Sequence, residues 1–413
     1  MTPPFPKGRL GGIKEEIMST SFKDKIAVVG VGCTKFAENF ELSYSDMLAE
    51  ACFQAFEEAN VEPKDIEAAW LSTAFVDASA MKGRSGMDLA ESVGLFDIPI
   101  TRVSNFCASG GNAFREACLA LLSGAYDIVL AVGAEKLRDR PPQKSLVKMM
   151  VEAQHPYLQK GETAAGQFAV YGTRHMEKYG TKIDHFCMIS HKNHKNGVKN
   201  PIAQYRQEIP LETILKSPMV AYPINVLCSC PTTDGAAAAI LVRAEDAKSF
   251  NRDYVLVKAQ ELIVNTGWDL PFFDPRYDFT NFPSTQVAAK KAYEMAGIKD
   301  PLKEIDLAEV HDCFAPVELI VYEDLGFCKK GEGKYFIEEG RSSFEGDLPV
   351  NISGGLESCG HPVGATGVRM IYEITRHLQG KAGERQVKNA RLGMAHNIGG
   401  PCAITSLTIL GAQ

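Results

Sequence analysis

Apolar runs and amphipathic stretches alternate along the chain. Short continuous apolar runs predict buried strands, and longer stretches with apolar residues every three or four positions predict helices. The runs that predict strands are residues 26–32, 101–106, 127–132, 236–242, 254–259, 306–310, 390–395 and 403–410. The stretches that predict helices are residues 108–122, 164–179 and 368–378. Strands that alternate with helices indicate an α/β protein with parallel, helix-covered sheets.

An internal repeat organises this pattern. Residues 55–61, with the sequence AFEEANV, correspond position for position to residues 292–298, with the sequence AYEMAGI. Both segments follow amphipathic sequence, and both lead through a short turn to an acidic residue, an isoleucine and an apolar run. The distance between the copies is far too long for a solenoid. We therefore expect two copies of one α/β unit, a duplicated domain.

The repeat divides the chain into an N-terminal extension, two halves and an insertion. We expect the extension at residues 1–24, the first half at 25–137 and 225–250, and the second half at 251–413. Residues 138–224 interrupt the pattern, because they are polar and rich in Lys, His and Pro. We expect them to form an inserted loop domain over the core, where segments that bind substrate often lie.

Composition and charge argue against several classes of protein. The 413 residues carry 44 Lys and Arg against 51 Asp and Glu, a net charge of −7. Nucleic-acid and membrane-surface proteins normally present a basic face, so we expect neither partner. No apolar run is long enough for a transmembrane helix, and the first 24 residues lack the apolar core of a secretory signal. Eleven scattered cysteines then indicate reduced thiols in the cytoplasm.

Cys107 is the leading candidate for a nucleophile. It follows a predicted strand and precedes ASGGN, which opens a predicted helix. A thiol at a helix N-terminus meets free N–H groups and the positive end of the helix dipole, which lower its pKa toward the thiolate form. Gly110 and Gly111 permit a tight turn and the close approach of a ligand. Position alone leaves a buried structural cysteine as an equal alternative.

His361 stands in the second copy where Cys107 stands in the first. Its segment CGHPVGATG, residues 359–367, also opens a predicted helix. A pseudo-two-fold relation between the halves would bring the two turns together and make His361 the base for Cys107. The alternative is a histidine that only caps its helix. His311 and Cys313 end a further predicted strand, where functional groups gather in open α/β sheets.

The remaining motifs point away from a bound metal or cofactor. Cys228 and Cys230 are separated by a single residue, and no second close pair completes a zinc site. Gly30 and Gly32 lack the third glycine and the acidic residue of a dinucleotide-binding fingerprint. Histidines interleaved with lysines are typical of a solvated face, and the insertion holds four of them, His175, His185, His191 and His194. We therefore expect no metal ion and no bound cofactor.

Five segments together resemble the thiolase superfamily. They are NFCASG at residues 105–110, CPTTDGA at 230–236, HDCF at 311–314, the glycine-rich run at 354–367, and HNIGG at 396–400, which we expect to form a glycine turn between strands. They span nearly the whole chain in the family's order. The resemblance implies a five-layer αβαβα thiolase fold made of two duplicated halves plus the inserted loop domain. It also implies a homodimer whose substrates are CoA and acyl-CoA.

The resemblance further implies a role for each candidate residue. Cys107 would take an acyl group from a CoA thioester, and His361 would activate this thiol and help to form an oxyanion hole. The commoner degradative pattern has Asn-Glu-Ala-Phe where this chain has His-Asp-Cys-Phe. This variant is similar to the sterol-carrier-type and archaeal-type thiolases. It implies that Cys313 is the second acid/base and that His311 lines the oxyanion hole.

The activity implied is that of a thiolase, a C-acyltransferase that cleaves or forms a β-oxoacyl-CoA. The substrate would be acetoacetyl-CoA or a bulkier, aromatic thioester such as benzoylsuccinyl-CoA. The segment VGVGCTKF, residues 29–36, is similar to thiolases that work with a small zinc-ribbon/OB-fold subunit. Two alternatives stay open. One is a β-ketoacyl synthase, which needs no thiol at position 313, and the other is a non-catalytic, thiolase-like scaffold subunit.

Overall fold

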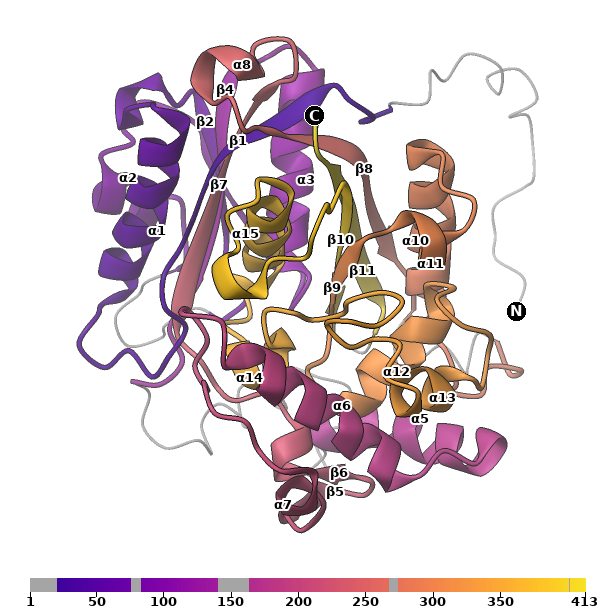
Figure 1. The fold of residues 1–413 in the computed structure, drawn as a ribbon. Helices are drawn as coiled ribbons and strands as arrows, with labels where there is room; N and C mark the ends of the chain where they lie inside the picture. The colour runs from indigo at the N-terminus through magenta and orange to yellow at the C-terminus, as the bar shows by residue number, and fades with distance from the viewer. Residues whose placement is uncertain (1–20, 76–82, 140–162, 267–273, 401) are drawn as a thin grey trace, which may run out of the picture.

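The computed structural model describes residues 21–75, 83–139, 163–266, 274–400 and 402–413. Most of the expected N-terminal extension and residues 140–162 of the expected insertion lie outside them. Within the described residues, nine strands join in one sheet in the order β3-β2-β4-β7-β1-β8-β11-β10-β9 (Figure 1). These strands are β1 Ile26–Cys33, β2 Ala68–Ser72, β3 Ile100–Val103, β4 Ile128–Glu135, β7 Gly235–Arg243, β8 Val255–Val264, β9 Leu307–Val310, β10 Leu392–Gly399 and β11 Ile404–Gly411.

Helices cover the sheet and a small hairpin stands apart from it. The hairpin pairs β5 Met219–Ala221 with β6 Ile224–Asn225. The helices are α1 Tyr44–Ala59, α2 Met87–Val93, α3 Ser109–Leu122, α5 Ala164–Tyr179, α6 Ile183–Gly197, α7 Leu211–Leu215, α8 Ala247–Phe250, α10 Pro283–Ala296, α11 Pro301–Glu304, α12 Ala315–Asp324, α13 Gly333–Glu338, α14 Gly355–Cys359 and α15 Thr366–Leu378.

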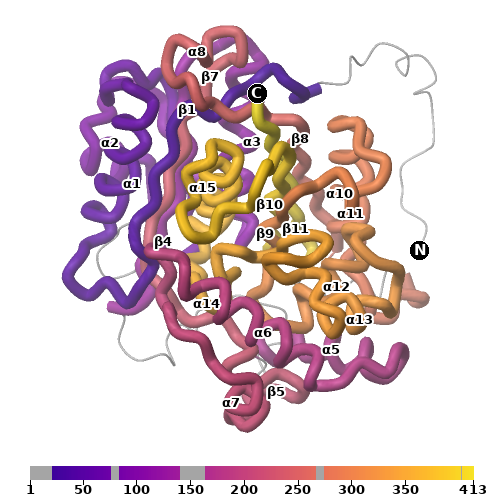
Figure 2. The backbone as a smooth tube through the Cα atoms, in the orientation of Figure 1, coloured from indigo at the N-terminus to yellow at the C-terminus, as the bar shows by residue number. Residues whose placement is uncertain are grey.

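The elements stack in five layers, which confirms the predicted αβαβα architecture. Helices α1 and α2 cover the outer face of the part of the sheet that runs from β3 to β1 (Figure 1). Helices α3 and α15 lie side by side between this part and the part from β8 to β9 (Figure 2). Helix α10 packs on the outer face of β8 and β11. The two helices of the central layer therefore each contact both halves of the sheet.

The strand order shows that the halves are duplicated. The order β1-β7-β4-β2 in the first half is mirrored by β8-β11-β10-β9 in the second, and each pair of neighbours has the same relative direction in both. The repeated segments, residues 55–61 and 292–298, form the C-terminal ends of α1 and α10 with the same geometry. Asn60 and Gly297 both adopt the left-handed conformation, and the next residues, Val61 and Ile298, donate back to the last turn of their helices.

Strand direction is one feature that differs from the sequence prediction. The sheet is mixed, because β1 and β7 pair antiparallel with their neighbours, whereas β2 pairs parallel with β3 and β4. After the long insertion between β4 and β7 the chain re-enters the sheet at the end where it left, because Gly235 at the start of β7 pairs with Glu135 at the end of β4. Alternation of strands and helices alone does not reveal such a return.

Strand β1 illustrates why the apolar runs are continuous. Ile26 and Val28 face the central layer, whereas Ala27 and Val29 face α1, so both faces of the strand are buried. Gly30 and Gly32 have a packing role, since a Cβ atom on either would lie 2.3 or 2.0 Å from a carbonyl oxygen of α1. Contact with α1 therefore accounts for the Val-Gly-Val-Gly segment.

The described part of the insertion packs on the second half of the molecule. Helices α5 and α6 contact α12, and α6 also contacts α13 and α14 (Figure 1). The prediction of a solvated histidine face is wrong, because His175, His185 and His194 are buried against these helices. The His175 imidazole, for example, lies 2.8 Å from Thr181 Oγ1 and 3.0 Å from Glu323 Oε1.

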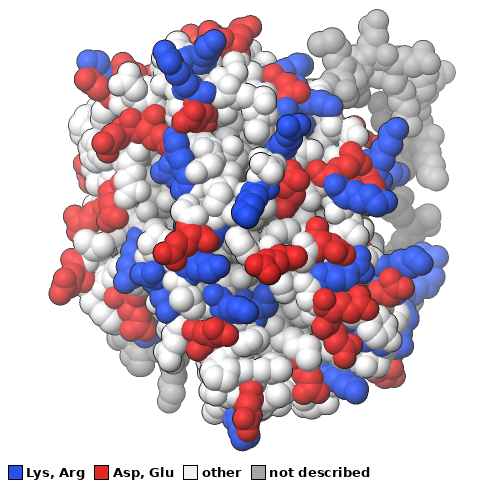
Figure 3. Space-filling view, in the orientation of Figure 1, with Lys and Arg blue, Asp and Glu red and all other residues white. Residues whose placement is uncertain are grey.

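Charges are mixed on the face of the molecule shown in Figure 3. Lysines and arginines are interspersed with acidic residues there. Ion pairs of the described residues include Lys178–Asp278 and Arg341–Asp347. No helix in the described part of the chain is long and apolar enough to cross a membrane.

Candidate active site

Three loops from both halves meet at the end of the central layer. Cys107 lies between β3 and α3, His361 between α14 and α15, and His311 directly after β9. One donor atom from each of these three side chains lies within 4.8 Å of the other two. The His311 and His361 rings meet edge to face, with centroids 5.3 Å apart. The predicted encounter of the two helix-opening turns is therefore present in the structure.

Close helix packing brings the two turns together. A Cβ atom on Gly110, in the first turn of α3, would lie 2.8 Å from the backbone nitrogen of Gly367 in the first turn of α15. A Cβ atom on Gly111 would collide with the Ser406 side chain at 2.2 Å. The two glycines were predicted to allow a ligand to approach. In the structure they allow α15 and β11 to approach α3.

A glycine turn shapes the Cys107 loop from the other side. A Cβ atom on Gly399 would lie 2.4 Å from the Asn105 carbonyl oxygen, so this residue must be glycine for β10 to end here. Phe106 has a φ of 49° and Ser109 Oγ donates to its carbonyl oxygen. Ser109 Oγ also accepts from the Asn105 backbone N–H at 2.7 Å. Cys107 itself remains partly exposed.

The Cys107 thiol differs from the prediction made from its position at the helix. Burial of the sulfur, followed by the negative charge of Glu135, raises the pKa of Cys107 to about 12. The N–H groups of Cys107 and Gly400 point at the sulfur and act in the opposite direction, but their effect is smaller. The helix N-terminus therefore does not by itself produce a thiolate, and the thiol needs a base.

His361 has the chemistry of such a base. Its Nδ1 lies 2.7 Å from Thr366 Oγ1, whose own proton goes to the Pro362 carbonyl oxygen at 3.0 Å. The Thr366 oxygen must then accept from Nδ1–H, which leaves Nε2 of the neutral ring unprotonated. This buried Nε2 has no hydrogen-bond partner among the described residues. Burial, followed by the charge of Arg369, lowers the pKa of His361 to about 3, so the ring is neutral at pH 7.

His311 presents the opposite tautomer. The amide Nδ2 of Asn397 lies 3.3 Å from Nδ1 of His311 and donates to it, so the neutral ring carries its proton on Nε2. Burial, followed by electrostatic coupling to the His361 and His396 rings, lowers the pKa of His311 well below its usual range. The site thus combines one imidazole that accepts a proton with one that donates a hydrogen bond.

Additional thiols surround the site. Burial raises the pKa of Cys313 well above its usual range, and the nearby Cys230, Cys107 and Cys402 sulfurs raise it further. The Cys230 backbone N–H donates to the Cys313 carbonyl oxygen at 2.9 Å. Sequence reasoning rejected Cys230 as a zinc ligand and gave its side chain no other role, although it opens the CPTTDGA segment. The structure places it next to Cys107 and Cys313.

Four of the five residues of the HNIGG segment, 396–399, lie in a strand and not in a turn. His396 and Asn397 belong to β10, and the turn begins only after Gly399. His396 Nε2 lies 3.0 Å from Thr285 Oγ1, and burial lowers the pKa of His396 to about 3. The segment extends the strand because its side chains alternate between α10 and the site, as at His396 and Asn397.

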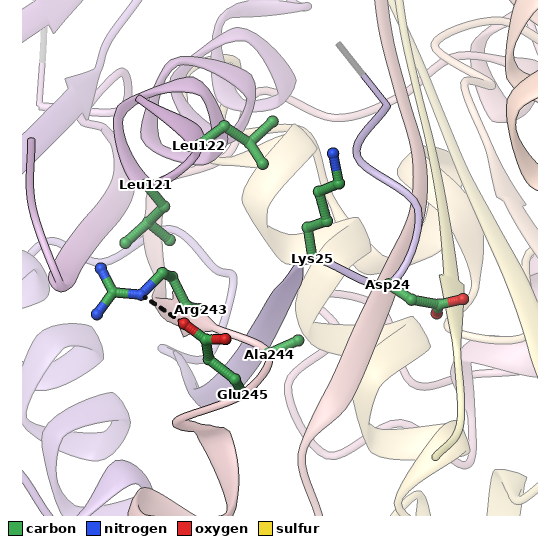
Figure 4. A pocket seen from close by; sticks show the side chains of 7 residues that line it. All are labelled: Asp24, Lys25, Leu121, Leu122, Arg243, Ala244 and Glu245. Carbon is green, nitrogen blue, oxygen red and sulfur yellow. Dashed lines mark ion pairs between the residues drawn. The ribbon is translucent and has the colours of Figure 1, made fainter. Parts of the chain in front are cut away.

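Other features of the structure bear less directly on this site. The side chains of Cys107, His311 and His361 are also of the types that bind zinc, so a metal site is the alternative for this cluster. The pairing of a thiol with a base favours a catalytic site. A cavity of about 330 Å³ lies at the far end of α3, beside Leu121, Leu122 and the Arg243–Glu245 ion pair (Figure 4). It is separated from Cys107 by the length of the helix.

The fold and the site together define a class of protein. Two duplicated α/β halves, with a thiol at one central helix and an imidazole at the other, constitute a thiolase fold with a Cys/His centre. The family model described as thiolase, N-terminal domain matches residues 26–221, and the model described as thiolase C-terminal domain-like matches residues 271–412. The chain belongs to the thiolase family.

Individual relatives support the sterol-carrier-type and archaeal-type resemblance. An acetyl-CoA acetyltransferase of Methanothermobacter thermautotrophicus is 40% identical over 375 residues, which cover 91% of this chain and 96% of that protein. Sterol carrier protein 2 of Bos taurus is 36% identical over 94% of this chain and 73% of its own length.

Two solved structures share the fold. The Ltp2-ChsH2(DUF35) aldolase matches with a TM-score of 0.80 and 25% identity, covering 95% of this chain and 98% of that chain. A monomeric SCP2-thiolase-like protein type 1 from Mycobacterium smegmatis matches with a TM-score of 0.70 and 16% identity, covering 94% of this chain and 77% of that chain.

Proposed function

We propose that this protein is a thiolase that cleaves or forms a β-oxoacyl-CoA through an acyl-enzyme on Cys107. The observation that carries the proposal is the grouping of Cys107, His311 and His361, with donor atoms within 4.8 Å of one another. The acetyltransferase name of the archaeal relative supports acyl transfer to CoA.

The first half-reaction breaks the bond between C2 and C3 of the substrate. His361 Nε2 takes the Cys107 proton, and the sulfur attacks the C3 carbonyl. The backbone N–H groups of Cys107 and Gly400, which point at the sulfur, stabilise the oxyanion. As the C2–C3 bond breaks, its electrons pass to the departing CoA thioester as an enolate. His311 Nε2–H donates to the enolate oxygen, and the Cys313 thiol protonates its carbon.

The second half-reaction regenerates the enzyme. The thiol of CoA gives its proton to the Cys313 thiolate left by the first half-reaction and attacks the acyl group on Cys107, so a shortened acyl-CoA leaves. Cys107 departs as a thiolate and regains the proton that His361 holds. A thiol is both nucleophile and leaving group here, so the same groups run the reaction toward condensation.

The decisive test is CoA-dependent loss of the absorbance of acetoacetyl-CoA, compared with an aromatic β-oxoacyl-CoA such as benzoylsuccinyl-CoA. Wild type is expected to turn over at least one of them, and Cys107→Ala to lose turnover. Cys52→Ala, which removes a buried thiol from α1 in the outer layer, serves as the matched control and should keep its activity. Turnover that persists in Cys107→Ala would refute the acyl-enzyme.

Cys313→Ala separates the two chemical steps. The variant should still exchange acyl groups between acyl-CoA and labelled CoA, because this exchange uses Cys107 and His361 alone. It should lose cleavage of the C–C bond by about a hundredfold or more, because no group remains to protonate the carbanion. Full cleavage by this variant would favour a mechanism of the β-ketoacyl synthase type.

A scaffold subunit is the second candidate, and the raised pKa of Cys107 favours it. An inert Cys107 would resist iodoacetamide near neutral pH even when acyl-CoA and partner proteins are present. Acyl-CoA that protects Cys107 from alkylation would instead support the thiolase, because the acyl group would occupy the sulfur.

We further propose two kinds of protein partner. Strand β3 is an edge strand that pairs only with β2 among the described residues, and Met87 and Phe96 next to it are 60% and 64% exposed. A second copy that adds its own edge there would form a homodimer. The DUF35 component named with the aldolase supports a small zinc-ribbon/OB-fold subunit as another partner. Sedimentation of the purified chain, with and without such a subunit, tests both.

A cytoplasmic location completes the proposal. All eleven cysteines are free in the structure, as a reducing compartment requires. Protein purified without reductant and then denatured should therefore titrate as eleven free thiols, and a lower count would contradict this location.

A further inference from the structure

The loop that carries His361 is wedged between two strand ends of the first half. A Cβ atom on Gly364 would lie 2.7 Å from Thr73 Cα, and a Cβ atom on Gly133 would lie 2.3 Å from the Gly364 carbonyl oxygen. Ser72 Oγ donates to that same oxygen at 2.6 Å. The ends of β2 and β4 thus hold Gly364, three residues after His361, in a narrow slot.

A single carboxylate closes this slot. Glu135, the last residue of β4, is fully buried, and each of its oxygens accepts two hydrogen bonds. One oxygen accepts from Thr73 Oγ1 and the Phe75 N–H, both at 3.0 Å. The other accepts from the N–H groups of Ala74 and Gly364, both at 2.9 Å. One side chain therefore ties the β2 loop of the first half to the His361 loop of the second.

None of these four donors is a cation. A buried carboxylate without a cationic partner is costly and persists where hydrogen bonds stabilise its charge. Burial raises the pKa of Glu135 to about 7, although the four donors act to lower it. The negative charge of the same carboxylate also acts on Cys107, where it opposes formation of the thiolate.

We propose that Glu135 is a positioning residue for the reaction, because its four hydrogen bonds anchor the His361 loop opposite Cys107. Its negative charge also opposes ionisation of the Cys107 thiol. This inference rests on the proposed thiolase function. The nucleophile and its base come from different halves. Glu135, together with Ser72, joins the ends of β4 and β2 in the first half to the His361 loop of the second.

Two substitutions separate the effect of the Glu135 hydrogen bonds on the His361 loop from the effect of the Glu135 charge on Cys107. Glu135→Gln keeps the length of the side chain, removes the charge and turns an amide NH2 toward N–H donors. Glu135→Asp keeps the charge, but it is one methylene shorter and cannot reach Gly364 N. Glu323→Gln is the control, because its buried carboxylate also accepts from a backbone N–H, that of Gly333 at 2.9 Å, and its other partners, His175 and Lys330, are not site residues.

The measurements are kcat for thiolysis and the pH profile of Cys107 alkylation by iodoacetamide, followed by mapping of the Cys107 peptide. Both Glu135 variants should lose kcat by about tenfold to a hundredfold, because the His361 loop is displaced. Glu135→Gln should shift the midpoint of alkylation about one pH unit lower, since one charge has gone. Glu135→Asp should keep the wild-type midpoint. Glu323→Gln should keep both properties.

These outcomes distinguish a failure of the Glu135 proposal from a failure of the proposed thiolase function. The other titratable groups around Cys107 are the same in every variant, namely His311, His361, Cys230, Cys313 and Cys402. An unshifted midpoint in Glu135→Gln, or unchanged kcat in both variants, would overturn the proposal. If wild type showed no thiolysis, the alkylation profiles would still test Glu135 independently of the proposed function. If Glu135→Gln failed to fold, Ser72→Ala would test the same loop anchor without altering the charge, and an unchanged kcat in it and in Glu135→Asp would overturn the proposal.

Discussion

The contact between the two central helices allows a sharp test of how the site is assembled. Replacing Gly110 by alanine adds a methyl group 2.8 Å from the backbone nitrogens of Gly367 and Val368, whereas ordinary van der Waals contact begins at 3.4 Å. Helices α3 and α15 must therefore separate by about 0.6 Å, since no flexible side chain can yield. Overpacking of this kind costs about 1–3 kcal/mol of unfolding free energy.

The same displacement should reach the chemistry. Cys107 lies three residues before Gly110, just ahead of α3, and His361 stands just before α15, so separation of the helices separates the thiol from its base. A misplacement of about 1 Å can cost a hundredfold in rate, and we expect Gly110→Ala to lose about tenfold or more in kcat. Urea unfolding and cleavage of acetoacetyl-CoA measure the two effects on one preparation.

A glycine at the other end of α15 provides the control. Gly380, just beyond the C-terminal end of this helix, has a φ of 72°, and the space that a Cβ atom would occupy there is open, so alanine costs about 1 kcal/mol of backbone strain without moving the helices apart. Gly380→Ala should lose stability and keep kcat. Wild-type turnover in Gly110→Ala, or an equal loss in Gly380→Ala, would refute the argument that helix separation controls the site.

Two further predictions concern buried ionisable groups. Burial lowers the pKa of His361 and of His396 to about 3, below the value of about 6.5 in an unfolded chain. The unfolded chain alone then binds these protons as the pH falls below about 6.5, so unfolding free energy should drop by up to about 2 kcal/mol per histidine between pH 6.5 and 5. Equal urea midpoints at pH 7 and pH 5 would contradict this. Arg369→Met should cost about 3–5 kcal/mol, because it leaves the Glu309 carboxylate buried without its cation, and the double variant Arg369→Met/Glu309→Leu should recover most of the loss in the same assay.

The sequence was sufficient for the repeat and for the encounter of Cys107 with His361. The segments at 55–61 and 292–298 preserve the same helix-ending geometry at Asn60 and Gly297, which is a local property that sequence records directly. Once the halves are equivalent, two residues at equivalent turns must meet near the pseudo-two-fold axis. The helix at residues 164–179 has the predicted bounds for the same reason, since its periodicity and its terminal Gly180 are local.

Properties that depend on distant neighbours were not predictable in this way. The pKa of Cys107 depends on burial and on Glu135, which is remote in the sequence, and these effects exceed the local effect of the helix N-terminus. His175 looks solvated beside its polar neighbours, yet Glu323 on a different helix supplies its partner. Glu135 itself stands at the end of an apolar strand without a motif, and only its four donors from two loops reveal it.

The mirrored strand order has a consequence for how such a centre can arise. Two identical units related by a two-fold axis can present only the same side chain twice at their shared axis, for example two cysteines or two histidines. In this protein both units belong to one chain, and their sheets join where β1 pairs with β8 at Ala27–Leu256 and Val28–Val255. Each position of the two units can therefore change independently of its counterpart. A thiol in one half can therefore face an imidazole at the equivalent position of the other half, because covalent fusion of the two copies lets their sequences differ.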